Sequence, residues 1–399
     1  MVELLAPAGN FSALNAALKN GANSVYIGLD GCNMRANISN FSMDDIEKAV
    51  KLTHENNVKL FICTNTLLKD EDLTLLEKQY PLLKNYGVDA VIVSDLGAAN
   101  IAIENDLVVH MSVQSNISNV KSLHSLKKLG ISRVILSREL SLREIKLICE
   151  KSPIEIEVFV HGALCMAISG RCFLSSYLYD KSANCGECLQ PCRKKWKLIL
   201  DDDGSEFILK NSNISNNNVS HFISPRDLCM VEHIPELIDS GVDALKIEGR
   251  ARPADYVATT VNVYREAIDL YFENKWEIKS YWLSNLKSVF NRGFDTGFYF
   301  RNYHQNSPKN QSTFIKKDIG QVVNYYSKIN VAEIHLWDNL KLNDEIIIQG
   351  PTTGSVKCKV VSMQIENINV KTAKRNENVG LLVDNRVRNN DLVYKLIPR

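Results

Sequence analysis

The sequence lacks the features of a membrane protein or an exported protein. Nowhere do 18 apolar residues follow one another, and the opening MVELLAPAGN has no basic segment before an apolar run. The 47 Lys and Arg residues are balanced by 46 Asp and Glu residues, so no overall positive charge indicates nucleic acid, although a local basic patch is still allowed. We therefore expect a cytoplasmic protein with no membrane partner.

Three short motifs that carry well-understood chemistry are also missing. The chain has no Gly-x-Gly-x-x-Gly at the start of a helix, no Gly-x-Ser-x-Gly and no His-Glu-x-x-His. These absences argue against a dinucleotide-binding fold, a serine hydrolase elbow and a zinc peptidase helix, respectively. What the chain does contain is 45% hydrophobic residues, as in an ordinary globular protein.

Eight short β-rich runs recur along the first two thirds of the chain, each followed by a helical pattern. Several helical patterns end in Gly just before the next run, as in LKNGAN, LKNYGVD, LKKLGIS and LIDSGVD. Strand, helix and Gly repeated in this way predict parallel strands covered by helices, most economically a (β/α)8 TIM-like barrel. A doubly wound open sheet is the alternative. The runs are 2–8, 24–28, 59–65, 90–95, 108–114, 133–139, 155–162 and 244–250.

The pattern divides the chain into three parts. Residues 1–275 are predicted to form the barrel, with a Cys-rich insertion at 163–222 on the carboxyl side of the seventh strand, where barrel enzymes place their active sites. Residues 276–312 are predicted to be a helical and loop linker. Short strands separated by turn signals over 313–399 predict a small all-β barrel.

Ten cysteines in a cytoplasmic chain are not expected to form a disulfide framework. Cys165, Cys172, Cys188 and Cys192 have the spacing C-x6-C-x15-C-x3-C, and Cys185 and Cys229 are further candidates. Four thiolates on one irregular segment suit an iron–sulfur cluster or a zinc ion, and a segment without metal is the third interpretation.

Basic residues follow the last cysteine of the insertion directly, at Arg193, Lys194 and Lys195. They could offset the charge of bound thiolates or hold a phosphate backbone. The alternative is a solvated strand edge.

Several predicted strands end in polar side chains that a core would not select. In a barrel these ends meet at one mouth, and cations there suit a carboxylate or phosphate ligand. The alternative is an ion-pair network that holds the rim. His110 and His161 are the candidates for moving a proton. The candidates for binding a substrate are Gln114, Arg138, Lys246, Glu248 and Arg250.

The stretch EVFVHGALCMAISGRCFLSSYL (157–178) resembles the cysteine motif of the U32 peptidase family, whose members are also called collagenase-like. The segments LLAPAGNFSALNAALKNGANSVYIGL, NMRANISNFS, HMSVQSNISN and DALKIEGRARPADYV are similar to that family as well. The resemblance covers roughly residues 2–300. The C-terminal β region resembles the small barrel that many members append.

The resemblance implies a function that differs from the family's name. Better-understood members are oxygen-independent hydroxylases with a [4Fe–4S] cluster. One branch hydroxylates uridine 34 of tRNA and depends on prephenate, a second modifies ribosomal RNA and a third acts in ubiquinone synthesis. Chain length and a single appended β domain favour the tRNA branch. When the family's cysteine motif is carried over onto this sequence, the implied cluster ligands are Cys165, Cys172, Cys188 and Cys192.

The same resemblance implies the partners of each region. Prephenate, or RNA phosphate, would be held by Arg138, Lys246 and Arg250. The basic run RKKWK (193–197) and the C-terminal barrel would bind the anticodon stem-loop, and a partner subunit of the same family is a further expectation. Cys185 lies where the family pattern has a basic residue, so Cys185 or Cys229 remains open as a ligand.

Several different functions stay open beside this one. A cysteine peptidase would pair His161 with Cys165, and a metallopeptidase would need an open zinc site. An rRNA hydroxylase and a non-catalytic RNA-binding protein with structural zinc also fit the sequence.

Overall fold

The computed structural model describes residues 2–31, 33–34, 40–196, 221, 223–301 and 309–399. Cys32, residues 197–220 of the predicted insertion and residues 302–308 of the predicted linker lie outside the described residues. Within the described part of the chain, no helix is long and apolar enough to cross a membrane.

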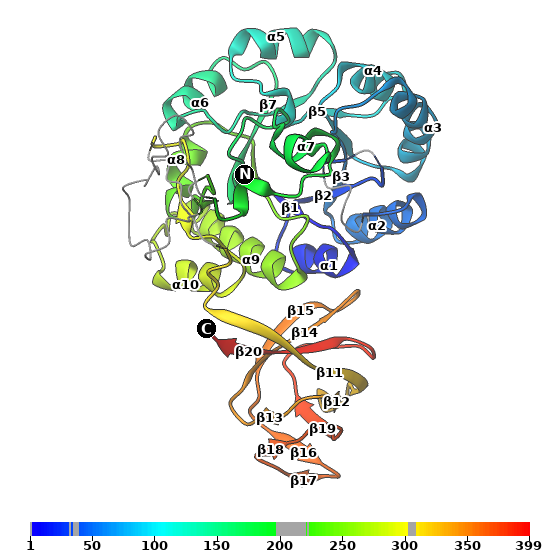
Figure 1. The fold of residues 1–399 in the computed structure, drawn as a ribbon, viewed down its shortest axis with the longest axis vertical. Coiled ribbons are helices and arrows are strands. Elements are labelled where there is room, and N and C mark those ends of the chain that lie inside the picture. The colour runs from blue at the N-terminus through cyan, green and yellow to red at the C-terminus, as the bar shows by residue number, and fades with distance from the viewer. Residues whose placement is uncertain (1, 32, 35–39, 197–220, 222, 302–308) are drawn as a thin grey trace, which may run out of the picture.

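Eight parallel strands close into a barrel, as the sequence predicts (Figure 1). The first strand pairs with the second and also with the last, where Leu5 is opposite Lys246, so the ring has no free edge. Nearly every residue of these strands is buried, because side chains fill the interior and helices cover the outside. The strands are β1 (Glu3–Pro7), β2 (Ser24–Gly28), β3 (Lys59–Thr64), β4 (Ala90–Val93), β5 (Val109–Met111), β6 (Arg133–Ile135), β7 (Glu155–Ala163) and β9 (Ala244–Ile247).

Local sequence accounts for the start of α2 and for the glycine that follows four of the outer helices. Ser42 caps α2 by accepting a hydrogen bond from the amide of Asp45, the Ser-x-x-Asp pattern in the sequence. The four glycines predicted to end helices all have φ between 84° and 90°, a left-handed conformation that turns the chain toward the next strand. These helices are α1 (Phe11–Lys19), α2 (Met43–Glu55), α3 (Asp70–Tyr86), α4 (Leu96–Glu104), α5 (Val120–Lys128), α6 (Leu142–Cys149), α8 (Ile234–Asp239) and α9 (Ala254–Phe272).

The Cys-rich insertion leaves the barrel at the carboxyl end of β7. It contains the short helix α7 (Leu174–Tyr179), which lies inside the ring of outer helices in Figure 1. The chain then returns as β8 (Asp227–Cys229), which runs antiparallel to the end of β7 and pairs with β10 (Phe294–Asp295). The helix α10 (Ser280–Ser288) buries Trp282 in the core of the barrel.

The C-terminal region is all-β and has its own core, as predicted. Eight antiparallel strands form one sheet in the order β15-β14-β20-β11-β12-β19-β16-β17, and β13 pairs with β18. The strands are β11 (Phe314–Tyr326), β12 (Val331–Leu336), β13 (Leu340–Lys341), β14 (Glu345–Gly350), β15 (Gly354–Lys359), β16 (Met363–Ile365), β17 (Ile368–Asn369), β18 (Thr372–Ala373), β19 (Asn378–Leu382) and β20 (Leu392–Pro398).

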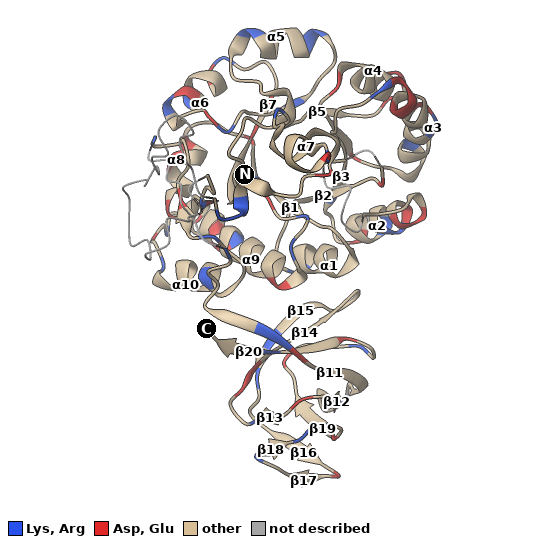
Figure 2. Ribbon diagram, in the orientation of Figure 1, with Lys and Arg blue, Asp and Glu red and all other residues tan. Residues whose placement is uncertain are grey.

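The β domain is attached to the outside of the barrel beside α1 and α9, away from the strand ends (Figure 1). Lys316 of β11 forms an ion pair of 2.8 Å with Asp255 of α9. The Lys19 ammonium of α1 donates to the carbonyl of Thr353, and the Asn15 amide donates to that of Pro351. The outer helices α2 and α3 carry charges of both signs (Figure 2).

Candidate functional site

A small cavity of about 60 Å³ lies at the carboxyl end of the barrel strands. Its walls come from β2, β3, β4, β6, β7 and β9 and from the residues that follow β5, which places it on the barrel axis where such folds carry their active sites. Five polar residues that the sequence predicts at the mouth line it together: Gln114, Arg138, Lys246, Glu248 and Arg250. Lys246, Glu248 and Arg250 alternate along one strand end and therefore face the same side.

Several polar atoms in this cavity are buried without a hydrogen-bond partner among the described residues. They include Nε of Arg138 and Nη1 of Arg250, and the side-chain oxygens of Asn65 and Gln114. The Asn65 amide nitrogen is satisfied, because it donates to the Ser112 hydroxyl at 2.9 Å. Buried polar atoms normally have partners, so a set of orphan donors and acceptors around one space indicates a ligand or water site.

The cations at the mouth stand against aromatic faces. The Lys246 ammonium lies 4.3 Å from the centre of the Tyr26 ring, and the Arg138 guanidinium lies 4.1 Å from that of Phe159. Aromatic faces stabilise a cation without neutralising it, so the Arg138 charge stays available to an anion. The Tyr26 hydroxyl is occupied, since it donates to the carbonyl of Ile247.

An ion-pair network fills the barrel interior beneath the cavity. Glu157 is fully buried and lies 2.8 Å from the Lys246 ammonium and 3.3 Å from the Arg133 guanidinium. Arg133 also pairs with Glu3 and Glu155 at the amino ends of their strands. Burial opposes the charge of Arg133, but the hydrogen bond to Glu3 and the surrounding carboxylates outweigh it and raise its pKa. This ionic network lies below the rim, and of the predicted mouth residues these ion pairs include Lys246.

The Cys-rich segment covers the mouth. The carbonyl of Ser169 accepts from the Asn116 amide, and the carbonyl of Asn184 accepts from the backbone of Leu67. Gly170 has φ +73°, and a Cβ there would lie 2.8 Å from the Gln114 side chain, so only glycine allows this close approach. The segment is thus a lid that contacts the ends of the third and fifth strands.

Nine cysteines lie among the described residues, and none of these nine forms a disulfide. Burial raises the pKa of Cys192, Arg193 lowers it, and Cys165, Cys188 and Cys172 raise it further. Besides Arg193, the groups whose charge acts on Cys192 are the other three thiols that the resemblance names as ligands. Four thiols on one segment are the donor set of an iron–sulfur cluster or zinc. In the described ranges, no three Cys, His, Asp or Glu side chains are arranged around a single metal ion.

The two remaining cysteine candidates are in different surroundings. Cys229 is on β8, deep in the barrel wall, where burial raises its pKa to about 11 and the Tyr264 hydroxyl lies 3.9 Å from its sulfur. Cys185 ends a single 3₁₀ turn of the lid and is half-buried. Only Cys185 therefore shares the lid with the four predicted ligands.

The basic residues after the last cysteine have two different environments. Arg193 is largely buried and donates to the Ser224 hydroxyl and to the carbonyls of Pro225 and Leu164. It ties both ends of the insertion together. Lys194 and Lys195 are exposed, and the Lys194 ammonium lies over the ring of Tyr179.

Neither predicted histidine lines the mouth cavity. His110 faces a separate cavity of about 420 Å³ at the amino end of the barrel, beside Arg133. Ser112 and Gln114 line the mouth, but the strand ends at Met111 and Gln114 lies in a 3₁₀ turn, so strand alternation does not extend from His110 to Gln114. Burial lowers its pKa well below the ordinary value, and the charges of Arg133 and Lys246 lower it further.

His161 is enclosed by rings behind the mouth. Tyr256, Tyr264 and Phe294 surround it with ring centres 5.4–5.9 Å away. Burial lowers its pKa to about 3, although the charge of Glu248 acts in the opposite direction. The side chain is therefore neutral and acts as a packing residue that contacts the Tyr264 hydroxyl at 3.3 Å.

The cavity also contains residues that the sequence did not single out as site residues. Cys63 and Phe159 line it, although Cys63 stands in a strand pattern typical of an ordinary buried thiol. Burial raises the pKa of Cys63, while Arg250 and Lys246 lower it. The alternation of side chains along a strand could have identified Cys63 as a cavity residue. Cys63 and Asn65 are two residues apart, so their side chains face the same side.

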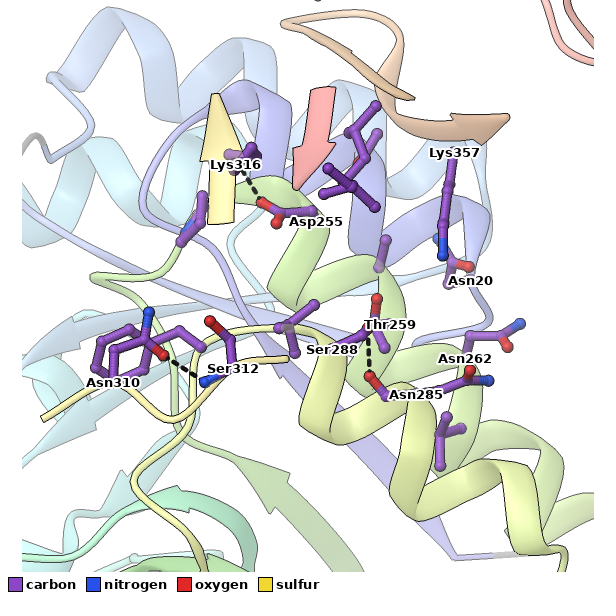
Figure 3. A pocket seen from close by; sticks show the side chains of 18 residues that line it. Asn20, Asp255, Thr259, Asn262, Asn285, Ser288, Asn310, Ser312, Lys316 and Lys357 are labelled. Atoms are coloured by element: carbon purple, nitrogen blue, oxygen red, sulfur yellow. Dashed lines mark hydrogen bonds and ion pairs between the residues drawn. The ribbon is translucent and has the colours of Figure 1, made fainter. Parts of the chain in front are cut away.

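A larger cavity of about 430 Å³ lies between the barrel and the β domain (Figure 3). Its walls carry amide and hydroxyl side chains from α9, from α10 and from Asn20 just after α1, and Lys316 lines it while paired with Asp255. Within the described residues, none of its polar side-chain atoms is buried without a partner. The mouth cavity is smaller but has unsatisfied charges, so it is the better candidate for chemistry.

The profile of peptidase family U32 matches residues 9–309. A protein of Methanocaldococcus jannaschii named an uncharacterized protease is 48% identical, over 99% of this chain and 98% of its own. A collagenase of Porphyromonas gingivalis is 34% identical, over 100% of this chain and 98% of its own. The tRNA hydroxylation protein P1 of Bacillus subtilis is 34% identical, over 88% of this chain and 83% of its own.

Proposed function

The chain belongs to peptidase family U32, and we propose that within this family it is an RNA hydroxylase that acts on uridine 34 of tRNA. Its similarity to a tRNA hydroxylation protein over most of both chains supports the RNA class. The observation that carries the proposal is the set of unpartnered cationic and amide groups around the mouth cavity.

The mouth would bind the small carboxylate that serves as hydroxyl donor, for which we propose prephenate. Arg138 and Arg250 each keep a buried N–H free for a carboxylate oxygen, and Lys246 adds a charge that Glu157 holds in place. The oxygens of Gln114 and Asn65 would accept hydrogen bonds from a donor hydroxyl. The arrangement favours an anion with hydroxyl groups over a neutral peptide.

Binding a molecule of that size requires the lid to shift. A cavity of about 60 Å³ admits a carboxylate head, whereas pockets that enclose a whole small molecule usually hold roughly 300 Å³ or more. The lid contacts the rim through a few backbone hydrogen bonds, such as that between Asn184 and Leu67. Its opening would admit the donor, and its closing would exclude water from the site.

The lid would also hold the cofactor. Cys165, Cys172, Cys188 and Cys192 would bind a [4Fe–4S] cluster, with zinc as the alternative. A cluster bound there would supply electron transfer next to the donor site. The clamp by Arg193 on the carbonyl of Leu164 would fix the first cysteine of the set relative to the barrel. The RNA would approach from the lid side, where Lys194 and Lys195 are exposed.

The site gives little support to a cysteine peptidase. An activated cysteine needs a lowered thiol pKa and a histidine able to accept its proton at the surface. His161 instead lies among rings with its pKa lowered to about 3, and the cysteine on the adjacent strand, Cys229, has its pKa raised to about 11. The exposed Cys165 is not hydrogen-bonded to a described histidine.

The test is mass spectrometry of tRNA nucleosides from a strain that lacks its own uridine 34 hydroxylase and expresses this chain anaerobically. We expect 5-hydroxyuridine derivatives with the wild type and none with Arg250→Ala or Cys172→Ser. Lys128→Ala, which removes an exposed cation at the far end of α5, is the matched control and should leave the product unchanged.

Measuring iron and acid-labile sulfide in the purified variants distinguishes the role of Cys172 from that of Arg250. Cys172→Ser should lower both, whereas Arg250→Ala should retain them. Absence of the product from all tRNA would contradict the proposal, and the same strain's ribosomal RNA would then be analysed for hydroxycytidine. Unmodified RNA of both kinds would leave the non-catalytic RNA-binding function.

A further inference from the structure

We propose that two exposed aromatic rings on the lid, Phe173 and Tyr177, form a stacking platform for unpaired bases of the RNA. We call this pair the Phe173–Tyr177 face. The inference rests on the proposed function and names the surface by which the RNA reaches the mouth.

The two rings are exposed to an unusual degree. Phe173 is 74% exposed and Tyr177 is 88% exposed, although large aromatic side chains are normally mostly buried. The amide of Tyr177 donates to the carbonyl of Phe173, so the two residues are one helical turn apart and on the same side of α7. Met166, Ile168 and Leu189 of the lid are also exposed and enlarge the apolar area. Such a patch indicates an interaction site.

The charge around the face suits a polyanion. Helix α7 itself has no charged residue and is uniformly tan in Figure 2. Residues 163–196, which contain it, include five Lys and Arg but only two Asp and Glu. Arg171, Lys194 and Lys195 are exposed, whereas Lys181 is paired with Glu187 at 3.6 Å. Rings set among cations are how proteins bind single-stranded nucleic acid, because bases stack and phosphates pair.

Lys194 is an example of a cation placed beside an aromatic ring of the lid. Its ammonium lies 4.3 Å from the centre of the Tyr179 ring and donates to the hydroxyl of Tyr179 at 2.7 Å. A protein partner would fit less well, because the cores of protein interfaces are depleted in lysine. The chemistry of the face therefore favours RNA over a second protein subunit.

The position of the face relative to the mouth fits the reaction. The lid that carries α7 contacts the rim of the barrel at Leu67 and Asn116. In an unpaired loop the bases can be separated, and an enzyme that modifies one of them must take it out of the stack. Stacking of neighbouring bases on the platform would hold the loop over the mouth while the target base enters.

The experiment measures the affinity of the full-length protein for a labelled anticodon stem-loop RNA with unmodified uridine 34, by fluorescence anisotropy. Phe173→Ala and Tyr177→Ala should each raise the dissociation constant roughly 5- to 150-fold, the range for loss of one base–aromatic stack. Tyr177→Phe keeps the ring and should bind like the wild type. A blunt duplex of the same stem should bind the variants and the wild type equally.

Phe272→Ala is the control for loss of an exposed ring. Phe272 is 38% exposed at the last position of α9, and the outer helices run opposite to the strands, so it lies at the amino end of the barrel. This variant should bind the stem-loop like the wild type. Both platform residues are at the surface, so circular dichroism and the iron content should be unchanged in their variants.

The outcomes separate this inference from the proposed function. Weaker loop binding by both alanine variants supports the platform, even if no hydroxylation is detected. Unchanged loop binding overturns it, even if the wild type hydroxylates tRNA. A change in oligomeric state on size-exclusion chromatography, with unchanged RNA binding, also overturns it and assigns the face to a protein subunit.

Discussion

The two ends of the barrel differ in whether their buried arginine is fully paired. At the amino end Arg133 is 4% exposed and meets three carboxylates, those of Glu3, Glu155 and Glu157. At the carboxyl end Arg250 is almost as buried, 6% exposed, yet its Nη1 atom has no partner among the described residues. The same residue type is neutralised at one end and left available at the other.

The difference shows which end is built for stability and which for binding. Burying a charge without a partner lowers the stability of the fold. An unpaired buried charge therefore persists only if the fold tolerates this loss or if a ligand supplies the missing partner. TIM-like barrels place catalysis at the carboxyl ends of the strands and stability at the amino ends. The charge distribution here follows this division, with Lys246 and Glu157 at the boundary.

The largest effect on stability is expected at that boundary. Glu157→Gln keeps the shape but removes the carboxylate shared by Lys246 and Arg133. Leaving buried cations uncompensated should lower the free energy of unfolding by about 3–5 kcal/mol. Urea unfolding followed by circular dichroism measures it. A loss below about 1 kcal/mol would mean that the network contributes little to the barrel.

The second largest effect is a pH dependence of folding stability caused by His161. The folded-state pKa of about 3 lies below the ordinary 6.5, so between these values the unfolded chain binds a proton that the folded chain does not. Stability should therefore fall as pH drops from 6.5 toward 3, by roughly 2–4 kcal/mol. His161→Phe should flatten this decline in melting temperature, whereas the exposed His124→Gln should not. Equal slopes for all three proteins would contradict the assignment.

A smaller effect of opposite sign is expected at the mouth. Arg250→Met replaces a buried, incompletely paired cation with an apolar side chain of similar length and should raise the free energy of unfolding by about 1 kcal/mol. The same variant should lose hydroxylation activity. A destabilised Arg250→Met protein would show that this arginine is structural, and the contrast between the two ends would then fail.

The smallest effect is expected at the exposed edge of the paired end. Lys59 lies 3.8 Å from Glu3, but its side chain is 60% exposed. Solvent screens such a pair, so Lys59→Ala should change the free energy of unfolding by less than about 0.5 kcal/mol. The urea measurement used for Glu157→Gln provides the comparison. A loss as large as that of the buried variant would mean that burial is not what makes the network strong.

The sequence predicted the architecture well because the relevant signals are local. Alternating strand and helix patterns, the cap at Ser42 and the glycines at the helix ends each act within a few residues. They placed all eight barrel strands, the all-β character of residues 314–399 and the lid at the end of the seventh strand. They also brought Lys246, Glu248 and Arg250 to one cavity, since alternation fixes the side that each faces.

Only the tertiary structure decided which charges are paired. Lys246 and Glu157 are 89 residues apart, and Arg133 and Glu3 are 130 apart, so their contacts exist only because the barrel closes. Closure also sets depth along the axis, which placed His110 in the cavity at the amino end although Gln114, four residues later, lines the mouth. Local sequence determines the side to which a residue points. The packing of distant strands determines what it meets there.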